Sequence, residues 1–347
     1  MAVAHRVRAL RAWFASHRRD LPWRAQPAGR REPYATWVAE VMLQQTRAEV
    51  VGPYYRRFLD AFPNLAALAA APEKRVLRAW AGLGYYRRAR MLHAAAGCVV
   101  RERGGRLPAS AAEWAELPGV GPYTAAAIAA QTTNEPVAAV DGNVKRLTAR
   151  VRGLDLPASA RALQAAAEEW AGGLVRASEA PGEIVEALME LGATVCTPRA
   201  PRCGECPLAA ECAAHAGGNE ETFPRAKEAV AWRSVELIGF VARRGAGLLL
   251  RERVAGWNPG LWEPPTLAAR RGESPQSAWR RLECGAARAL VEIGDVRHVI
   301  TRHKIRARVF AVDGWRGGPQ AVREAEVGLT GLARKMIRLQ ETAAARA

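Results

Sequence analysis

The stretch from Leu117 to Asn143, LPGVGPYTAAAIAAQTTNEPVAAVDGN, decides the fold of the first half of the chain. Its two glycines, Gly119 and Gly121, predict a tight turn that leads directly into small residues of high helix propensity. The amide groups of a helix N-terminus suit a phosphate group, and glycines let a nucleic-acid backbone approach closely. The stretch therefore predicts a helical hairpin that can bind a phosphate.

After this helix, a short apolar segment leads to Asp141 at an Asp-Gly-Asn turn before a further helix. An aspartate in this place is most often a helix N-cap, and Gly-x-Gly alone is weak evidence for phosphate binding. The combination is less common, because it sets a carboxylate near a phosphate-binding hairpin. Asp141 is therefore a candidate functional residue as well as a candidate cap.

A second carboxylate lies in a helix expected from Tyr34 to Thr46, which Pro33 opens and which is apolar on nearly every side. Glu40 has no obvious solvent-facing side there. It is either a costly buried charge or a carboxylic acid kept protonated by desolvation, and a general acid needs the second state. Spacing alone leaves the structural and the catalytic interpretation open.

The composition favours a polyanionic partner. The 347 residues include 51 Lys and Arg against 34 Asp and Glu, which gives a formal charge of +17. No apolar run is long enough to span a membrane. The Arg-rich N-terminus has the composition of a transit peptide, but Val3, Val7, Leu10 and Phe14 form one apolar stripe at helical spacing, which favours a domain helix.

Four of the six cysteines form a Cys-x6-Cys-x2-Cys-x5-Cys run. Four thiolates this close together hold a metal centre. Zinc is the first alternative, although its usual pattern is two closely spaced pairs and this run has one. The ligands are expected to be Cys196, Cys203, Cys206 and Cys212, and Cys98 and Cys284 are expected to be buried thiols.

Beyond the cysteine run the pattern changes. Residues 213–230 lose periodicity and gather Gly, Asn, Glu and Pro, as a linker does. A hairpin is expected in which a strand from Val235 to Ala242 and a second strand over residues 248–253 flank a Gly-Ala-Gly turn. A helix from about Pro275 and a strand region from His298 to Val312 are expected to follow. The predicted organisation is a helical domain over residues 1–212 that includes the cysteine loop at 196–212, a linker at 213–230, and an α+β domain over residues 231–347.

The hairpin, the helix motif Glu-Val-Met-Leu-Gln-Gln-Thr and the cysteine spacing resemble those of the MutY-type adenine DNA glycosylases, in the superfamily that includes endonuclease III. The resemblance covers nearly the whole chain. It implies a mainly α helix-hairpin-helix glycosylase domain with a [4Fe-4S] cluster and a Nudix-like α+β C-terminal domain. The acidic metal-binding cluster of Nudix hydrolases is missing, so we expect no pyrophosphate hydrolysis.

The resemblance implies excision of adenine opposite 8-oxoguanine or guanine in double-stranded DNA by a monomeric, cytoplasmic, nucleoid-associated bacterial enzyme. Glu40 is expected to protonate adenine N7, and ionised Asp141 to stabilise an oxocarbenium-like sugar. Tyr123 stands where endonuclease III has a nucleophilic lysine, so imine formation and strand cleavage are not expected. Asn143 matches a further position of the active site.

The resemblance also implies a set of DNA contacts. Gly119 and Gly121 would hold a phosphate, and the loop Gly-Leu-Gly-Tyr-Tyr would present rings and an aliphatic wedge, unless its tyrosines cap the core. Arg24 of the Pro-Trp-Arg motif is a further expected contact, and the segment that follows it, AQPAGRRE, is a few residues longer than is usual. The remaining expected contacts are Gln45, Thr46, Leu83, Tyr85 and Glu186.

In the second domain, Ile300, Thr301 and Arg302 replace the Phe-Ser-His with which typical members sense 8-oxoguanine. This replacement predicts a weaker preference for 8-oxoguanine. Two rival functions stay open: a glycosylase/lyase for oxidised pyrimidines, and a DNA-binding iron–sulfur protein without activity. Tyr123 argues against the first, and Glu40 with Asp141 argues against the second.

Overall fold

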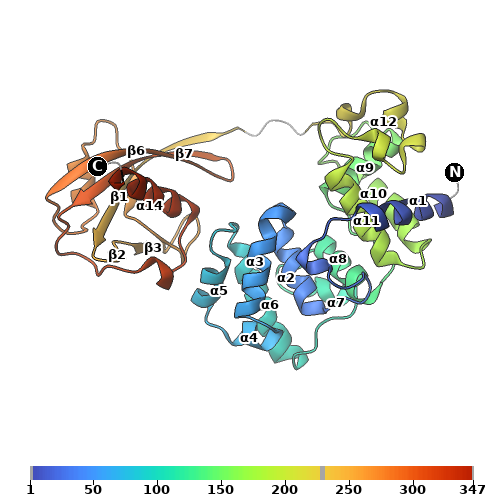
Figure 1. Ribbon diagram of the computed structural model, residues 1–347, viewed down its shortest axis with the longest axis horizontal. Coiled ribbons are helices and arrows are strands. Elements are labelled where there is room, and N and C mark those ends of the chain that lie inside the picture. The colour runs from blue at the N-terminus through green and yellow to red at the C-terminus, as the bar shows by residue number, and fades with distance from the viewer. Residues whose placement is uncertain (1–2, 227–230, 346–347) are drawn as a thin grey trace. The chain divides into compact units, whose positions relative to one another are not determined.

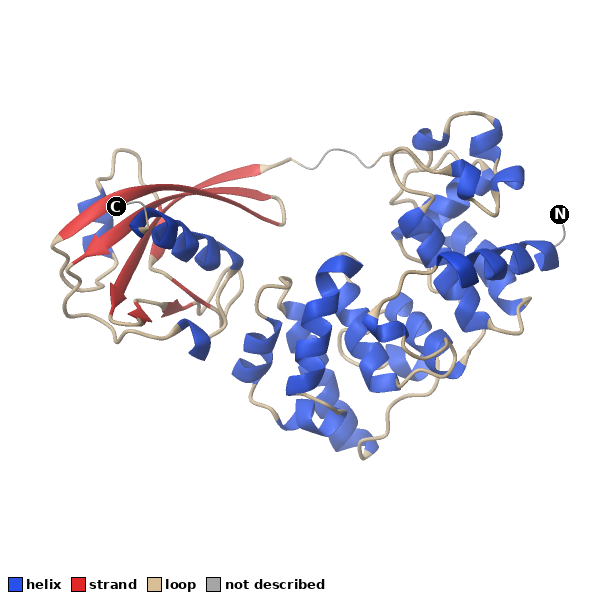
Figure 2. Cartoon of the chain, in the orientation of Figure 1, coloured by secondary structure: helices blue, strands red, loops and turns tan. Residues whose placement is uncertain are grey.

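The computed structural model describes residues 3–226 and 231–345, which form two compact units (Figure 1). The first unit takes the described residues within 1–70 and 91–228, and the second takes those within 71–90 and 229–347. The first is helical, and the second contains the β-sheet (Figure 2). The mainly α and α+β classes expected from the sequence are confirmed.

Helices account for nearly all regular structure between residues 3 and 226. In the described parts of the chain, no helix combines the length and the apolar character that crossing a membrane requires. The helices are α1 (Val3–His17), α2 (Pro33–Leu43), α3 (Ala48–Ala61), α4 (Leu65–Ala70), α5 (Glu73–Trp80), α6 (Arg87–Arg103), α7 (Ala111–Ala115), α8 (Pro122–Thr133), α9 (Gly142–Arg152), α10 (Arg161–Arg176), α11 (Pro181–Thr194) and α12 (Ala213–Ala216), with short 3-10 turns η1 (Pro22–Arg24), η2 (Cys203–Glu205), η3 (Ala209–Glu211) and η4 (Glu220–Thr222).

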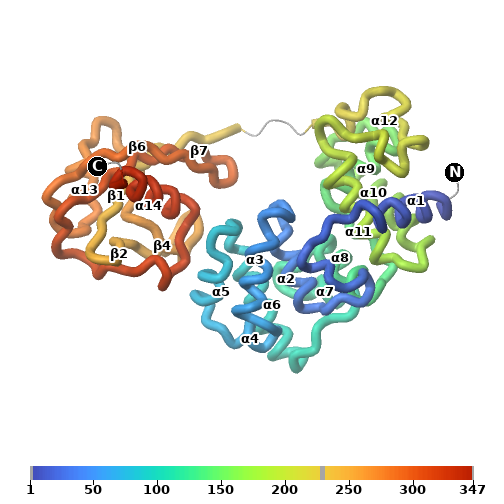
Figure 3. The backbone as a smooth tube through the Cα atoms, viewed as in Figure 1, coloured from blue at the N-terminus to red at the C-terminus, as the bar shows by residue number. Residues whose placement is uncertain are grey.

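The N-terminal helix is part of the core, as the apolar stripe predicts. Leu10 and Phe14 of α1 are fully buried and pack with side chains of α9, α10 and α11. Figure 3 shows α1 running beside α11. Val3, at the start of the stripe, is exposed, so the stripe contacts the core only from Val7 onward. The interpretation as a domain helix is therefore confirmed.

The hairpin joins α7 to α8, and its two glycines serve different purposes. Gly119 has φ +79°, and a Cβ there would lie 2.4 Å from Cβ of Met91, so only glycine fits. A Cβ on Gly121 would meet nothing within 4 Å, which leaves open space at the start of α8. The turn therefore combines a position that only glycine can occupy with an open backbone.

The second unit has a sheet in the order β2-β1-β7-β6, with β5 also paired to β1. Successive residues of β1 point to opposite faces of the sheet, and a helix covers each face. Phe240 packs with Trp279 of α13 (Pro275–Arg281), whereas Val241 packs with Met336 of α14 (Gly331–Ala344). The strands are β1 (Arg233–Arg244), β2 (Gly247–Leu248), β5 (Thr266–Ala268), β6 (Ala289–Ile300) and β7 (His303–Asp313), and β3 (Arg251–Glu252) pairs separately with β4 (Trp262–Glu263).

Two sequence expectations for this unit need correction. The strand region from His298 to Val312 is the end of β6 and nearly all of β7, which pair antiparallel around a turn at Thr301 and Arg302. The hairpin after β1 is short, because β2 has two residues and the long partner of β1 is the parallel strand β7. Helix α14 was not expected from the sequence.

The expected linker is partly held by the helical unit. The amide of Ala158 donates to the carbonyl of Arg225, and the side chain of Arg150 donates to the carbonyls of Glu220 and Phe223. Residues 227–230 lie outside the described residues. The domain boundaries at 212 and 231 stay a prediction.

Candidate active site and cysteine loop

A pocket of about 510 Å³ lies in the helical unit, within the range of small-molecule sites. It is lined from α2, α8, α9 and α11 and from the segments that follow α1 and α2. Eight residues that the sequence singled out line it together: Arg24, Glu40, Gln45, Thr46, Tyr123, Asp141, Asn143 and Glu186.

Glu40 is almost completely buried, as its place in an apolar helix predicts. Its Oε1 accepts a hydrogen bond from Nε2 of Gln131 at 2.7 Å. Its Oε2 is buried and has no partner among the described residues. Burial raises the pKa of Glu40 to about 7, against the opposing hydrogen bond from Gln131. Glu40 therefore keeps a proton near neutral pH, as a general acid must.

Asp141 is the N-cap of α9, so the structural interpretation of this residue holds as well. Its Oδ1 accepts from the amides of Asn143 and Val144, both at 2.8 Å, and its Oδ2 accepts from Nδ2 of Asn143 at 2.8 Å. Burial raises the pKa of Asp141, and these bonds counteract the rise. A carboxylate that accepts three bonds in a pocket wall is held in one orientation.

Tyr123 lies one residue into α8, and its hydroxyl donates to Sδ of Met189 at 3.2 Å. Burial raises the pKa of Tyr123 well above its usual value, and the nearby carboxyl groups of Glu40 and Asp141 add to the rise. The phenol is thus neutral, and it lines the same pocket as the two acids. It offers a hydroxyl group but no amine nucleophile.

Buried ion pairs fix one wall of the pocket. Arg24 donates to Glu186 at 3.1 Å and to Glu190 at 3.0 Å, and Arg19 donates to Glu190 at 2.7 Å. Burial opposes ionisation of Glu190, but the bonds from both arginines lower its pKa overall. Arg24 and Glu186, expected near the substrate, therefore hold each other in place.

The other expected DNA contacts do not line this pocket. Leu83 is buried and Tyr85 is half exposed with φ +49°, so the aliphatic wedge expected at Leu83 is not on the surface. Ile300, Thr301 and Arg302 lie in the second unit, where Thr301 has φ +51° at the turn between β6 and β7. Gly119 and Gly121 precede α8.

The cysteine loop is tied to the same helix that Asp141 caps. Arg146 of α9 donates to the carbonyl of Cys196 at 2.8 Å and to Oδ1 of Asn143 at 2.9 Å. Arg150, one turn later and fully buried, donates to the carbonyl of Thr197 at 2.6 Å and to Sγ of Cys196 at 3.3 Å. Two arginines of α9 therefore hold the start of the loop.

The four thiols expected as ligands line one cavity, and no disulfide joins them in the described chain. Burial raises the pKa of Cys203 to about 11 and that of Cys206 to about 12, with further increases from the neighbouring thiols. Four thiolates this close repel one another unless a cation lies between them. The donor set therefore fits a metal centre, which cross-links the loop when it is bound.

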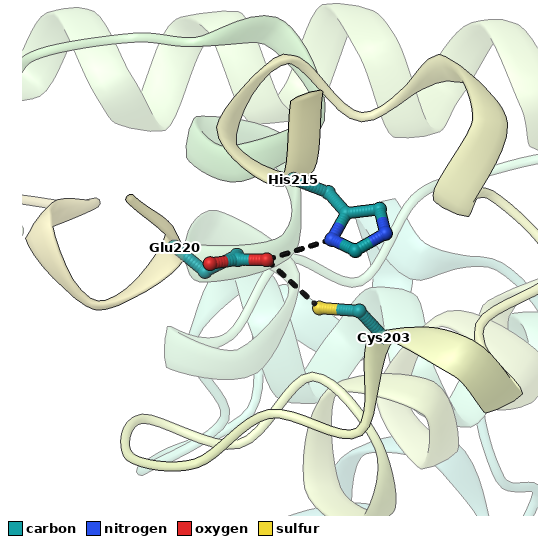
Figure 4. A group of neighbouring side chains, drawn as sticks. All are labelled: Cys203, His215 and Glu220. Carbon is teal, nitrogen blue, oxygen red and sulfur yellow. Dashed lines mark hydrogen bonds and ion pairs between the residues drawn. The ribbon is translucent and has the colours of Figure 1, made fainter. Parts of the chain in front are cut away.

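A second group of side chains adjoins one ligand (Figure 4). Oε1 of Glu220 lies 2.7 Å from Nδ1 of His215 and 3.3 Å from Sγ of Cys203. Hydrogen-bonded side chains beside a ligand orient it. Of the other two cysteines, Cys284 is buried as expected, but Cys98 is only partly buried and donates to Glu102.

Several residues of the site were missed from the sequence. Gln131 is the clearest, because it is a single polar residue at the end of the small apolar run of α8, and its side chain reaches Glu40. Arg31 lies in a segment that reads as a basic loop, and no periodicity marks it. Arg146 and Arg150 look like ordinary basic residues of a helix. Arg19, Met189 and Glu190 also line the site.

Comparisons with known proteins agree with this geometry. Residues 38–172 match a model described as HhH-GPD superfamily base excision DNA repair protein, and residues 196–212 match the iron-sulfur binding domain of endonuclease III. The chain belongs to this superfamily of helix-hairpin-helix base excision repair proteins. Its sequence relatives at 33 to 43% identity are named adenine DNA glycosylases. The second match confirms a [4Fe-4S] cluster as the cofactor.

The relatives come from both mammals and bacteria. An adenine DNA glycosylase of Rattus norvegicus is 43% identical over 213 residues, which are 60% of this chain and 41% of the relative. One of Mycolicibacterium smegmatis is 42% identical over 204 residues, 57% of this chain and 66% of the relative. A solved structure of a thermostable thymine-DNA glycosylase gives a TM-score of 0.53 at 26% identity, covering 62% of this chain and 98% of that one. The chain thus spans about two fifths of the length of the rat relative.

Proposed function

We propose that the protein is a monofunctional DNA glycosylase that removes adenine mispaired with 8-oxoguanine or guanine in double-stranded DNA. The observation that carries the proposal is Glu40, a buried carboxylic acid with one unpartnered oxygen in the same pocket as Asp141 and Tyr123. The names of the sequence relatives support adenine as the base. The formal charge of +17 supports DNA as the partner.

The pocket residues divide the reaction between them. Adenine cannot be reached inside a duplex, so it must turn out of the stack into the pocket. Glu40 donates its proton to N7 of the base, which makes the base a better leaving group. Asp141, whose ionised form is favoured by the bonds it accepts, stabilises the positive charge that develops on the sugar, and water completes the hydrolysis.

Tyr123 sets the outcome at the sugar. A phenol cannot form an imine with the opened sugar, so the abasic strand stays intact. Asn143 orients Asp141, and Glu186 and Arg24 form the wall that receives the base. Gln45 and Thr46 line the pocket, and we expect them near the opposite base together with the exposed Tyr85.

The second unit is proposed to act as a Nudix-like domain in which Ile300 and Thr301 contact the base opposite adenine and Arg302 contacts a phosphate. The protein is proposed to act as a monomer in the bacterial cytoplasm, at the nucleoid. The domain limits proposed are residues 1–212 and 231–347.

The test uses duplexes that carry adenine opposite 8-oxoguanine, guanine or thymine, incubated with excess protein under single-turnover conditions. Strands are analysed with and without alkali, which reveals abasic sites. We expect alkali-dependent cleavage at adenine opposite 8-oxoguanine and guanine, and at least a ~100-fold slower reaction with Glu40→Gln. Cleavage only at oxidised pyrimidines, or undiminished excision by the variant, would overturn the proposal.

A further inference from the structure

A chain of four buried side chains runs through the wall of the pocket to the acid. Nη2 of Arg31 donates to Oε2 of Glu186 at 2.6 Å, and Nη1 of Arg31 donates to Oε1 of Gln131 at 2.5 Å. Nε2 of Gln131 then donates to Oε1 of Glu40 at 2.7 Å. All four side chains are at most 4% exposed.

The hydrogen bonds that link these four side chains have one donor-to-acceptor direction. Arg31 has only donors, so the amide oxygen of Gln131 must face it. The NH₂ group of Gln131 must then face Glu40, which makes Oε1 of Glu40 an acceptor. An amide that bonds on both sides to groups of fixed character has one orientation, because the flipped amide would place NH₂ against the guanidinium.

Arg31 is itself fixed by the segment that is longer than is usual. Its Nε donates to the carbonyl of Gln26 at 3.0 Å. The amides of Gly29 and Arg31 both donate to the backbone carbonyl of Gln131, at 2.6 and 3.3 Å. The segment AQPAGRRE therefore wraps around the residue that bonds to Glu40. It holds both the backbone and the side chain of that residue.

Resting on the proposed function, we propose that Arg31 and Gln131 are positioning residues that decide which oxygen of Glu40 carries the acid proton. Because Oε1 is occupied by the donor from Gln131, the proton is held on Oε2. In the reaction the O–H bond at Oε2 breaks and an N–H bond forms on the base. Glu40 is left as a carboxylate, and Gln131 still donates to its Oε1.

Several charged and titratable groups act on Glu40 besides this amide. The negative charge of Glu186 on α11 opposes ionisation, and the positive charges of Arg31 and Arg24 favour it. Tyr123 on α8 stays neutral. Removing the donor of Gln131 leaves these groups in place and makes the carboxylate form less stable. The pH at which Glu40 loses its proton must then rise.

The test compares Gln131→Leu with wild type in single-turnover excision of adenine opposite 8-oxoguanine across pH. We expect the rate at its low-pH plateau to fall by about 10-fold, the value of one hydrogen bond. We also expect the decline of the rate on the alkaline side of the pH profile, the alkaline limb, to move to higher pH. Gln131→Glu keeps the shape and the contact with Arg31 but has no donor for ionised Glu40, so its limb should move in the same direction.

The matched control is Thr132→Val on the same helix. Thr132 is buried and its hydroxyl donates only to the carbonyl of Ile128, so its loss removes a bond of similar strength without touching Glu40. Its plateau and its limb should equal those of wild type. A shift in this variant equal to that of Gln131→Leu would mean that general loosening of α8 causes the change, and the proposal would be overturned.

A measurement without turnover separates this proposal from the proposed function. The pKa of Glu40 is followed by NMR in protein with ¹³C-labelled glutamate carboxyl groups, with Glu40→Gln used to assign the signal. A higher pKa in Gln131→Leu and Gln131→Glu supports the positioning role even if wild type excises no adenine. The same pKa in wild type and both variants overturns it even if wild type is an active glycosylase.

Discussion

Asp141 and Arg150 lie on one helix, α9, with Asp141 capping its N-terminus in the pocket wall and Arg150 binding the cysteine loop from its third turn. At 1.5 Å per residue, the two positions are about 13 Å apart along the helix axis. The pocket carboxylate and the cluster loop are therefore attached to the same rigid element.

Arg150→Met should lower the iron content of the purified protein below four irons per chain. The variant removes the donors that hold the carbonyls of Thr197, Glu220 and Phe223 in a buried place. It should also lower the melting temperature by several degrees. Iron analysis and thermal unfolding of protein purified without air give the measurement.

Arg152→Met is the control on the same helix, because Arg152 is exposed and its pair with Glu169 is 3.6 Å long. It should keep the iron content and the melting temperature of wild type. Full iron in Arg150→Met would show that this arginine is not needed to shape the loop.

Asp141→Asn should distinguish the helix-capping role of Asp141 from its proposed catalytic role. Asparagine is as good an N-cap as aspartate, so the melting temperature should stay within about 2 °C of wild type. Adenine excision should nevertheless fall by at least ~100-fold, because the amide carries no charge to stabilise the sugar cation. Asp141→Ala should lose the cap as well, at about 1 kcal/mol. Normal excision by Asp141→Asn would assign the residue to structure alone.

The raised pKa of Glu40 predicts a pH-dependent cost in stability. Between pH 4.5, the ordinary pKa of the group, and about pH 7, folded protein keeps a proton that unfolded protein releases. The free energy of unfolding therefore falls as the pH rises through this range. Glu40→Gln has no such group. The difference in unfolding free energy between Glu40→Gln and wild type should therefore shift in favour of the variant by up to about 3 kcal/mol when the pH is raised from 4.5 to 8.

Urea unfolding of both proteins at the two pH values gives the free energies. The exposed Glu49, changed to Gln, is the control and should show no comparable gain. Above pH 7, adenine excision by wild type should fall about tenfold per pH unit, since only protonated Glu40 is an acid. A flat rate up to pH 9 would contradict the assignment.

Borohydride trapping tests the chemistry at Tyr123. Wild type should give almost no covalent adduct with DNA, because neither a phenol nor a carboxylate forms an imine. Tyr123→Lys should give a strong adduct, since it places an amine in the pocket that Glu40 and Asp141 line. Strong trapping by wild type would indicate a glycosylase with strand-cleaving activity.

Substitution of Arg302 tests how the second unit contacts DNA. It is exposed at the turn between β6 and β7, and as a donor only it can contact a phosphate but cannot accept from N7–H of 8-oxoguanine. Arg302→Ala should therefore reduce the salt dependence of DNA binding by about one phosphate contact and leave the preference for 8-oxoguanine over guanine unchanged. Arg306→Ala is the control, because Arg306 is already paired with Asp295. Lost discrimination with an unchanged salt slope would make Arg302 a lesion reader.

Sequence patterns predicted those parts of the site that depend on local rules. Glycine at positive φ, an acid before a helix and four closely spaced cysteines each have a local physical cause, and Gly119, Asp141 and Cys196 follow those causes. Glu40 was predicted as buried because apolar neighbours left it no solvent-facing side. The helix it lies in ends at Leu43, three residues earlier than expected.

Long-range partners were beyond the reach of such patterns. Arg31 meets Gln131 because the segment before α2 packs against the end of α8, and neither residue carries a local signal of the other. The parallel pairing of β1 with β7 was missed for the same reason, since a strand does not show which distant strand it will join. Leu83 was expected on the surface because its glycine-rich neighbours read as a loop, yet a loop residue can be buried.

The pairing of β1 with β7 also bears on how the protein is made. Arg233, at the start of β1, pairs with His303, which is 70 residues later in the chain. A ribosome must therefore complete β6 and β7 before the central strand pair of the sheet can form, and during that time the apolar face of β1 is open to other chains. A premature stop codon before β7 would leave β1 without this partner, and the cell would then face an aggregation-prone product rather than a shorter working protein.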